Sequence, residues 1–290
     1  MTAEGIAAAS LSVVRRAYAK QIVHAARADD PRLAEALAAL PREDFLPPPP
    51  WRIMHMAFGY ETGPVTDPVY LYQDAPVAIL PEKRLNNGQP SFLTRLIAAG
   101  DIRDGAHAIH IGTGTGYYTA VIATLVGASG RITGIEIEPD LAAQATSNLA
   151  RFSNVLIHTG DGAAVTLDPA DVVFVNAGVS RLAPAWLDAL EPGGRLILPL
   201  TVGFTSEMGQ PMTRGAVFRI TRDADGYAAT CLSRTVIYPC AGQRDPVSEA
   251  ALAAAFAKDG IGRVTRLHRT GDIPEERCWL KTPSWCLAYD

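Results

Sequence analysis

The chain has 290 residues, of which 48% are hydrophobic and 19% are charged, and its formal net charge is −4. This composition is typical of a globular protein, and the acidic balance offers no basic surface for nucleic acid. No stretch approaches the roughly 18 consecutive apolar residues that a membrane-spanning helix needs. The N-terminal charges follow the apolar part, which is the wrong order for a signal peptide. The cysteines lack CxxC spacing, so we expect reduced thiols in a cytoplasmic protein and no metal site.

The first part of the chain predicts two helices and a proline-rich connector. Apolar residues at helical spacing over 4–28 predict the first helix. Residues 30–40 predict the second, with Asp30 as its N-cap and a proline at its first position. Consecutive prolines within 41–51 exclude a helix or a central strand and indicate a connector. A strand is expected at the end of 70–79.

In the middle of the chain, short apolar runs alternate with helical patterns. The expected strands cover residues 106–112, 131–137, 154–162, 171–178 and 195–200, and the expected helices cover 117–127, 139–152 and 184–194. This alternation is typical of βαβ units and predicts an α/β fold with a doubly wound, mostly parallel sheet. The strands are apolar throughout, as strands buried on both faces are.

The last part of the chain has a different pattern. Residues 214–238 predict an antiparallel hairpin that turns at Asp225-Gly226. A helix is expected over 248–258, and a closing strand region over 278–290. We therefore divide the chain into an N-terminal helical segment (1–50), a main domain (51–245) and a C-terminal extension packed on that domain (246–290).

The stretch "IGTGTGYY" lies between an expected strand and an expected helix. Its glycines, Gly112, Gly114 and Gly116, allow the backbone to approach a ligand, and the following helix N-terminus favours negative charge. Glu136 lies about 20 residues further on, at the end of the next strand, where a carboxylate can accept hydrogen bonds from ribose hydroxyls. The alternative is a tight turn without a ligand. The pattern favours a nucleotide site.

The spacing of the glycines distinguishes two kinds of nucleotide site. A dinucleotide fold expects G-x-G-x-x-G, whereas G-x-G-x-G resembles class I S-adenosyl-L-methionine-dependent methyltransferases. The turn "TGDGA" strengthens this resemblance, which implies that Asp161 and Gly162 hold the adenine. Asn176 and the small residues after it would line the cleft near the methyl group. The cofactor contacts implied by the resemblance come from Gln89, Gly112, Thr113, Gly114, Gly116, Tyr117, Glu136, Asp161, Gly162 and Asn176.

Several further stretches resemble the protein-L-isoaspartate O-methyltransferases. They are "LPREDFLP", "YQDAPVAI", "IGTGTGYYTAVIA", "GDGA", "LEPGGRLILPL" and "VIYP", in the family's order. Many methyltransferases share the block over 106–200, so the N-terminal segments and "VIYP" point to this family. The resemblance implies methyl transfer from S-adenosyl-L-methionine to a carboxylate of an isoaspartyl protein or peptide, or of a small molecule. The net charge and the lack of a long apolar stretch lead us to expect no nucleic acid and no membrane partner, and the sequence leaves the oligomeric state open.

One segment departs from the family pattern. The family has Gly-Gln-Thr-Ile-Ser before the glycine loop, with its Thr and Ser beside the methyl donor and the acceptor carboxylate. Here Gly88 and Gln89 match, but Pro90 and Ser91 follow directly. The resemblance makes Ser91 the candidate catalytic residue. A helix N-cap is the alternative role for Ser91, and the two roles are compatible.

A carboxylate acceptor is ionised at neutral pH, because its reference pKa is about 4, and it needs no general base. The sequence agrees, since its histidines are scattered and no Ser-His-Asp constellation stands out. We interpret His110, in the strand before the glycine loop, as structural or loosely cofactor-lining.

Three other functions stay open at this point. The first is a methyltransferase for a different peptide or small-molecule acceptor. The second is a nicotinamide-dependent oxidoreductase, which the glycine spacing and "GDG" disfavour. The third is a non-catalytic cofactor-binding regulator, for which the altered "GQPS" stretch is the best support.

Overall fold

The computed structural model describes residues 3–54, 63–205, 211–240 and 242–290. They form two compact units, each described here by itself. The first unit comprises Met1–Gly105 and Thr113–Thr159, and the second comprises Ala106–Gly112 and Gly160–Asp290. The chain therefore passes between the units three times, once inside the glycine loop and once just before Asp161.

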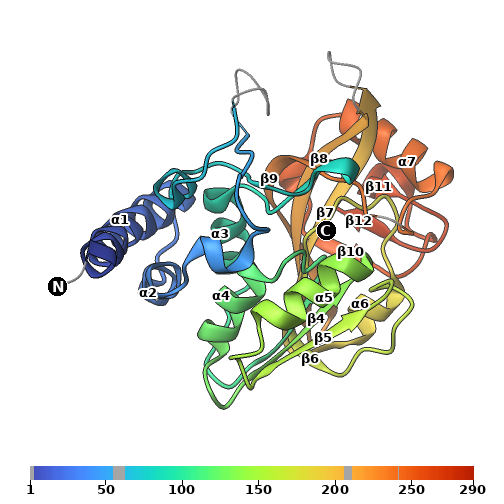
Figure 1. Cartoon of the computed structure of the whole chain (residues 1–290). Helices are drawn as coiled ribbons and strands as arrows, with labels where there is room; N and C mark the ends of the chain where they lie inside the picture. Colours follow the sequence, from blue (N-terminus) through green and yellow to red (C-terminus); the bar gives the residue numbers. More distant parts are fainter. Residues whose placement is uncertain (1–2, 55–62, 206–210, 241) are drawn as a thin grey trace. The chain divides into compact units, whose positions relative to one another are not determined.

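The first unit contains most of the helices (Figure 1). Its helices are α1 (Ala3–Ala26), α2 (Pro31–Ala39), α3 (Pro90–Ala99), α4 (Tyr117–Val126) and α5 (Pro139–Asn148), with short 3₁₀ turns at Arg42–Phe45, Pro68–Leu71 and Pro81–Lys83. Its strands are β1 (Ala78–Leu80), β2 (Leu85–Asn86), β4 (Arg131–Glu136) and β5 (Val155–Thr159). Strands β4 and β5 are parallel, and β1 and β2 form a small antiparallel pair.

Local sequence explains where α2 begins. The Asp30 carboxylate accepts a hydrogen bond from the backbone N–H of Arg32 at 3.0 Å, and Pro31 occupies the first helical position. Proline loses nothing there, because the first N–H groups of a helix have no partner within the helix. The predicted helix over 30–40 and its cap are confirmed.

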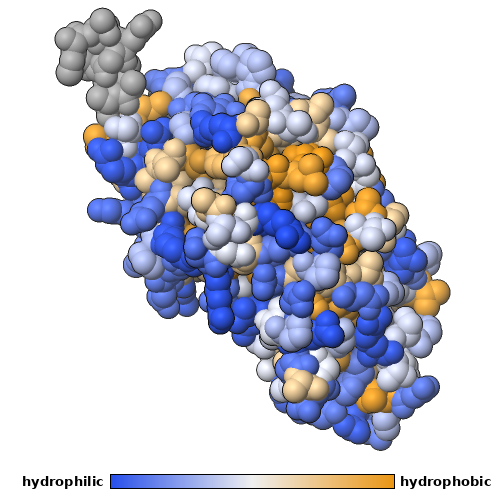
Figure 2. All heavy atoms as spheres, turned by 90° about the horizontal axis from the view of Figure 1, so that it is seen from below, coloured by the Kyte–Doolittle hydropathy of each residue, from blue (hydrophilic) through white to orange (hydrophobic). Residues whose placement is uncertain are grey.

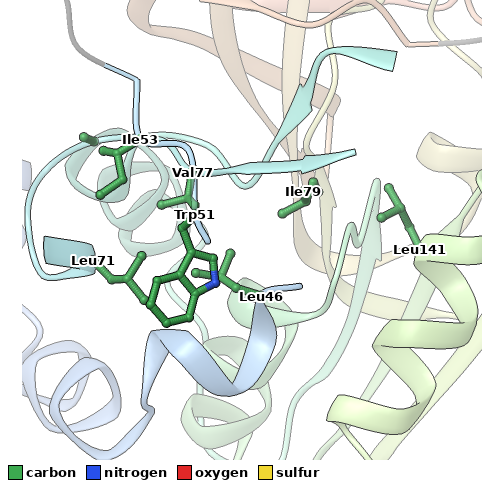
Figure 3. Packing of buried hydrophobic residues seen from close by; sticks show 8 residues of the cluster. Leu46, Trp51, Ile53, Leu71, Val77, Ile79 and Leu141 are labelled. Atoms are coloured by element: carbon green, nitrogen blue, oxygen red, sulfur yellow. The ribbon is translucent and has the colours of Figure 1, made fainter. Parts of the chain in front are cut away.

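A cluster of buried apolar side chains fixes the irregular segment between α2 and α3. Figure 3 shows Trp51 between Leu46 and Leu71, with Val77 and Ile79 further along the same segment. The backbone of Trp51 also exchanges hydrogen bonds with Val65 at 2.8 and 2.9 Å. The described part of this segment has little regular secondary structure. Burial of the apolar side chains of this cluster therefore keeps its backbone in place.

The second unit is built on a run of strands in the order β3-β6-β7-β8-β9-β10-β12-β11. These strands are β3 (His107–Ile111), β6 (Ala170–Val175), β7 (Leu190–Thr205), β8 (Pro211–Asp223), β9 (Gly226–Ile237), β10 (Arg266–His268), β11 (Cys278–Lys281) and β12 (Cys286–Ala288). The pairs β3/β6 and β6/β7 are parallel, and the others are antiparallel. The helices of this unit are α6 (Pro184–Asp188) and α7 (Pro246–Ala257). The α/β class is confirmed, and the C-terminal strands extend its antiparallel part.

Two expected elements of the second unit have different bounds. The helix expected over 184–194 ends at Asp188, because Leu190 already pairs with Ala170 of β6. The register then shifts until Arg195, and this irregularity accommodates the Pro-Gly-Gly sequence. The hairpin is confirmed, but its turn is Ala224-Asp225, since Gly226 already pairs with Asp223.

None of the helices in the described part of the chain is long and apolar enough to cross a membrane. On the face drawn in Figure 2, hydrophobic residues occur in small groups among hydrophilic ones.

Candidate active site

The glycine loop, residues 112–116, has a backbone that favours glycine. Gly112, Gly114 and Gly116 have φ of 81°, 58° and 97°, in the left-handed region. Gly116 is the N-cap of α4, and a Cβ there would lie 2.8 Å from Leu149 of the first unit. Any larger residue would strain the backbone and push α4 away from this contact. Gly116 is buried, whereas Gly112 and Gly114 are half-buried, and all three lie between β3 and the N-terminus of α4, where a nucleotide site is expected.

Glu136, at the end of β4, is only 5% exposed. The Gly114 N–H donates to its Oε2 at 2.7 Å, and the Glu138 N–H donates to its Oε1 at 3.0 Å. Burial raises the pKa of Glu136, and the backbone donors partly offset this rise. The Ile137 N–H also acts on this carboxylate, which can accept several hydrogen bonds in all. The sequence placed Glu136 one strand after the loop, and the structure joins the two by a hydrogen bond.

Two predicted cofactor residues of the first unit have buried side chains. Thr113 donates to the Ile135 carbonyl through its N–H at 3.3 Å and its Oγ1 at 3.4 Å, which ties the loop to β4. Tyr117 packs its ring edge-on against Phe45, with centroids 5.6 Å apart. Burial raises the pKa of the Tyr117 phenol well above its usual value. Both side chains hold the loop in place, and a direct cofactor contact from either remains a prediction.

In the second unit, Asp161 and Gly162 form the expected turn. The Ala163 N–H donates to Asp161 Oδ1 at 2.9 Å, and Trp186 Nε1 donates to the Gly162 carbonyl at 2.9 Å. A Cβ on Gly162 would lie 2.6 Å from Ile111 of β3. Gly162 therefore has a packing reason to be glycine, whatever its role in binding.

Asn176 follows β6 in the second unit, next to Gly112. Its N–H donates to the Ile111 carbonyl at 2.8 Å, and its Nδ2 donates to the Gly112 carbonyl at 3.4 Å. A Cβ on Gly112 would come within 3.3 Å of the Asn176 carbonyl oxygen. The structure therefore brings Gly112 and Asn176 together, and the place of Asn176 beside the methyl group stays a prediction.

Gln89 and Ser91 lie at the start of α3 in the first unit, and both bind Asp74. Ser91 Oγ donates to Asp74 Oδ2 at 2.6 Å, and Gln89 Nε2 donates to the same oxygen at 3.1 Å. The helix begins at Pro90, and Gln89 occupies the N-cap position. The alternative role of Ser91 as the N-cap is therefore wrong. Sequence reasoning missed Asp74, although "YQDAPVAI" contains it.

Arg42 is the second residue that sequence reasoning missed. It is 1% exposed, and its guanidinium donates to the carbonyls of Leu71, Gln73 at 3.1 Å and Ala75 at 3.3 Å. It also lies over the ring of Tyr18, 5.6 Å from the centroid. A buried arginine is costly unless its donors are bound, and here backbone carbonyls bind both terminal nitrogens, whereas the buried Nε has no hydrogen-bond partner in the described part of the chain. Its presence within "LPREDFLP" was the only signal.

His110 is fully buried in β3, with its ring 5.3 Å from that of Phe174. Burial lowers its pKa to about 3, so the imidazole is neutral at physiological pH. This agrees with a structural role. Within the residues that the structure describes, no cluster of His, Cys, Asp and Glu could hold a metal ion.

A G-x-G-x-G loop after a strand, a buried acid after the next strand and an acidic turn after the following one agree with the class of methyltransferases that use S-adenosyl-L-methionine, and the family comparison assigns the chain to that class. The family model for protein-L-isoaspartate(D-aspartate) O-methyltransferase matches residues 16–244, and the chain belongs to this family.

Individual relatives carry the same family name. The chain is 29% identical over 211 residues to the protein-L-isoaspartate O-methyltransferase of Ignicoccus hospitalis, covering 71% of this chain and 87% of the relative. It is 34% identical to protein-L-isoaspartate O-methyltransferase 1 of Anaeromyxobacter over 59% of this chain and 73% of the relative. A Plasmodium falciparum protein described as a protein-L-isoaspartate O-methyltransferase was solved with S-adenosyl-L-homocysteine. It shares the fold at a TM-score of 0.58 and 19% identity, covering 78% of this chain and 97% of that one.

The predicted enzyme class and cofactor are therefore confirmed, and the nicotinamide-dependent alternative is wrong. The residues present fit S-adenosyl-L-methionine. Gly112 and Gly114 are half-buried and carry no side chain at the start of α4, and the Glu136 carboxylate, which can accept several hydrogen bonds, lies beside them in the chain's next strand.

Proposed function

We propose that this enzyme methylates the free carboxylate of isoaspartyl residues in proteins or peptides. A small-molecule carboxylate is the second candidate acceptor. The relatives' names support the first, because they specify an isoaspartate substrate. As part of this proposal we keep the cytoplasmic location that the cysteine content favours.

One structural observation carries the proposal. The two segments that most specifically resemble the isoaspartyl enzymes, "LPREDFLP" and "YQDAPVAI", pack on each other in the first unit. Arg42 of the first segment donates to three backbone carbonyls between Leu71 and Ala75 of the second. The second segment in turn binds Ser91 through Asp74. The family-specific residues thus form one connected structure that ends at the candidate catalytic serine.

We assign roles to the site residues as part of this proposal. Glu136 would accept hydrogen bonds from the ribose hydroxyls, and Asp161 would accept one from the adenine amino group. Backbone groups of Gly112, Gly114 and Gly116 would lie against the cofactor. Asn176 and Gln89 would border the methyl group. When bound, S-adenosyl-L-methionine supplies an electrophilic methyl group.

The protein's own contribution to the reaction is orientation and exclusion of water. The acceptor carboxylate is already anionic, because its reference pKa of about 4 lies well below neutral pH. No residue needs to remove a proton from it. The enzyme must instead align this oxygen and strip part of its hydration shell, and such alignment supplies a large part of the barrier reduction.

A different acceptor is favoured by one observation. Pro90 stands where the family carries a Thr-Ile pair, and it starts α3 without an N–H of its own. The hydrogen-bond donors near Ser91 therefore differ from those of the family pattern. This difference affects the expected identity of the methyl acceptor more than the expected binding of S-adenosyl-L-methionine.

The test is methyl transfer from radiolabelled S-adenosyl-L-methionine to an isoaspartyl peptide, with the ordinary aspartyl peptide of the same sequence as control. We expect base-labile label on the isoaspartyl peptide alone. Label on neither peptide, together with measurable binding of S-adenosyl-L-homocysteine, would contradict the isoaspartyl acceptor. A panel of small carboxylates would then be assayed in the same way.

A further inference from the structure

Asp74 makes two hydrogen bonds to a single residue, Ser91. Its Oδ1 accepts from the Ser91 backbone N–H at 2.8 Å, and its Oδ2 accepts from Ser91 Oγ at 2.6 Å. Gln89 Nε2 adds a third hydrogen bond to Oδ2, at 3.1 Å. Both candidate residues at the start of α3 thus converge on one carboxylate that comes from a segment 17 residues away.

The chemistry of this pair fixes the direction of the hydroxyl bond. An ionised carboxylate can only accept hydrogen bonds, so the Ser91 O–H must be the donor. Its proton is therefore committed to Asp74, and the lone pairs of Oγ remain for another partner. We propose that Asp74 is a positioning residue that makes the Ser91 hydroxyl an acceptor, rather than a donor, toward the substrate.

The surroundings of Asp74 hold it in this position. Leu71, Ala75 and Val77 on its two sides are buried in the apolar cluster drawn in Figure 3. The Arg42 guanidinium binds the carbonyls of Gln73 and Ala75, the residues on either side of Asp74. The exposed carboxylate therefore projects from a backbone that cannot shift without breaking buried hydrogen bonds.

A purely structural role accounts for only one of the two bonds. Gln89, at the N-cap position of α3, makes no side-chain capping bond, and Asp74 supplies that cap through the Ser91 N–H. A cap needs no bond to the hydroxyl. The shorter bond to Oγ has no capping function, and it is the bond that sets the role of Ser91.

This inference rests on the proposed function and narrows its substrate. A hydroxyl that only accepts recognises an N–H group. The isoaspartyl linkage places a backbone N–H on the same Cα as the free carboxylate. The negative charge of Asp74 disfavours a second carboxylate bound directly at Ser91. Ser91 would therefore orient the acceptor by its amide, leaving the carboxylate free to react.

The experiment compares Asp74→Asn, Ser91→Ala and the double variant with the unaltered protein. Asparagine keeps the shape but donates through Nδ2, so it releases the Ser91 proton. Asp67→Asn is the matched control, because Asp67 caps the Pro68–Leu71 turn through the Val69 N–H at 2.9 Å and has no link to Ser91. The readouts are kcat and KM with an isoaspartyl peptide, the affinity for S-adenosyl-L-homocysteine by calorimetry, and Tm.

We expect Asp74→Asn to lower kcat about 10-fold, the effect of losing one charge-assisted hydrogen bond. Its Tm should shift no more than that of Asp67→Asn, and the affinity for S-adenosyl-L-homocysteine should hold. In the Ser91→Ala variant, adding Asp74→Asn should alter kcat by less than about twofold. Alanine keeps the backbone N–H that Asp74 caps but lacks the hydroxyl that Asp74 orients.

Three results would overturn the inference. They are an unchanged kcat in Asp74→Asn, an equal loss of kcat with and without Ser91, and full activity of Ser91→Ala. In each case the unaltered enzyme still methylates the isoaspartyl peptide, so the proposed function survives. If the unaltered enzyme leaves that peptide unlabelled, the proposed function fails, and the substrate orientation argued here fails with it.

Discussion

The two carboxylates assigned to the cofactor are held in different ways. Glu136, in the first unit, is buried, and backbone N–H groups of its own unit bind both of its oxygens. Asp161, in the second unit, is partly exposed and accepts from the Ala163 N–H through one oxygen. Its other oxygen lies against Gly242, far along the chain. Glu136 is thus bound through both oxygens by its own strand and loop, whereas Asp161 is bound through one oxygen and has its other oxygen beside a distant segment.

Removing each carboxylate tests this difference most strongly. We expect Glu136→Ala to weaken S-adenosyl-L-methionine binding about 100-fold, since two charge-assisted hydrogen bonds are lost, and Asp161→Ala about 10-fold. Calorimetric titration with the cofactor measures both. Unchanged affinity in both variants would overturn the assignment of these residues, and a larger effect at Asp161 would reverse the comparison.

Gly242 offers a way to disturb Asp161 without replacing it. A Cβ at Gly242 would lie 2.8 Å from Asp161 Oδ2, so Gly242→Ala must displace the carboxylate. Gly193→Ala is the matched control, because both glycines have φ of 81° and a Cβ at Gly193 meets nothing within 4 Å.

Both variants should lose the stability that a positive φ takes from alanine, about 1 kcal/mol. Only Gly242→Ala should also lose cofactor affinity, by several-fold. Equal affinities in the two variants would show that the position of Asp161 does not matter for binding.

The raised pKa of Glu136 makes cofactor binding sensitive to pH. Ribose hydroxyls donate to the ionised carboxylate, so affinity should fall as pH drops through the raised pKa, in a window above the usual value of about 4.3. Glu136→Gln should remove this dependence, as titration calorimetry across the window would show.

Stability without cofactor should change in the opposite direction. A folded-state pKa above the unfolded one means that the folded protein binds the proton more tightly. The contribution of Glu136 is therefore complete at low pH and is lost as pH rises through the folded pKa. Thermal unfolding at a series of pH values measures it, with Glu136→Gln again as control. A slope of the same size in that variant would assign the effect to another group.

The smallest effect is expected at Lys83. Its ammonium pairs with the side chain of Glu138, whose backbone N–H binds Glu136. Lys83 is more than half exposed, and exposed ion pairs contribute little. Lys83→Ala should change cofactor affinity by less than about twofold. A larger loss would mean that the backbone bond to Glu136 depends on the side-chain pair.

Features set by neighbouring residues were predicted well from the sequence. The cap of α2 by Asp30, and the order of strands and helices from β3 to β6, follow from local periodicity and turn residues. The end of α6 was mispredicted because a distant strand captures Leu190. Strand β10 was missed because three residues form a strand only through their pairing with β9 and β12.

The candidate site also contains residues that a local pattern identifies and residues that only distant contacts identify. Glu136 was found because its distance along the chain from the glycine loop is characteristic, and the structure joins it to Gly114. Asp74 was missed because its partner lies on another element, and no local pattern connects the two. Arg42 was missed because a charged side chain is expected at the surface. Its burial is tolerated because the fold brings backbone carbonyls to its guanidinium. The roles assigned to these residues remain predictions until they are measured.

The short segment Ala106–Gly112 belongs to the second unit, although first-unit residues precede and follow it. During synthesis, β3 leaves the ribosome well before its parallel partner β6 exists. The pairing of β3 with β6 therefore cannot form while the chain is made from the N-terminus onward. The newborn chain must carry an apolar strand without its β6 neighbour for the time it takes to translate the intervening residues. Neither unit corresponds to a continuous piece of the gene, so this enzyme offers no simple place at which to cut it into halves that fold separately.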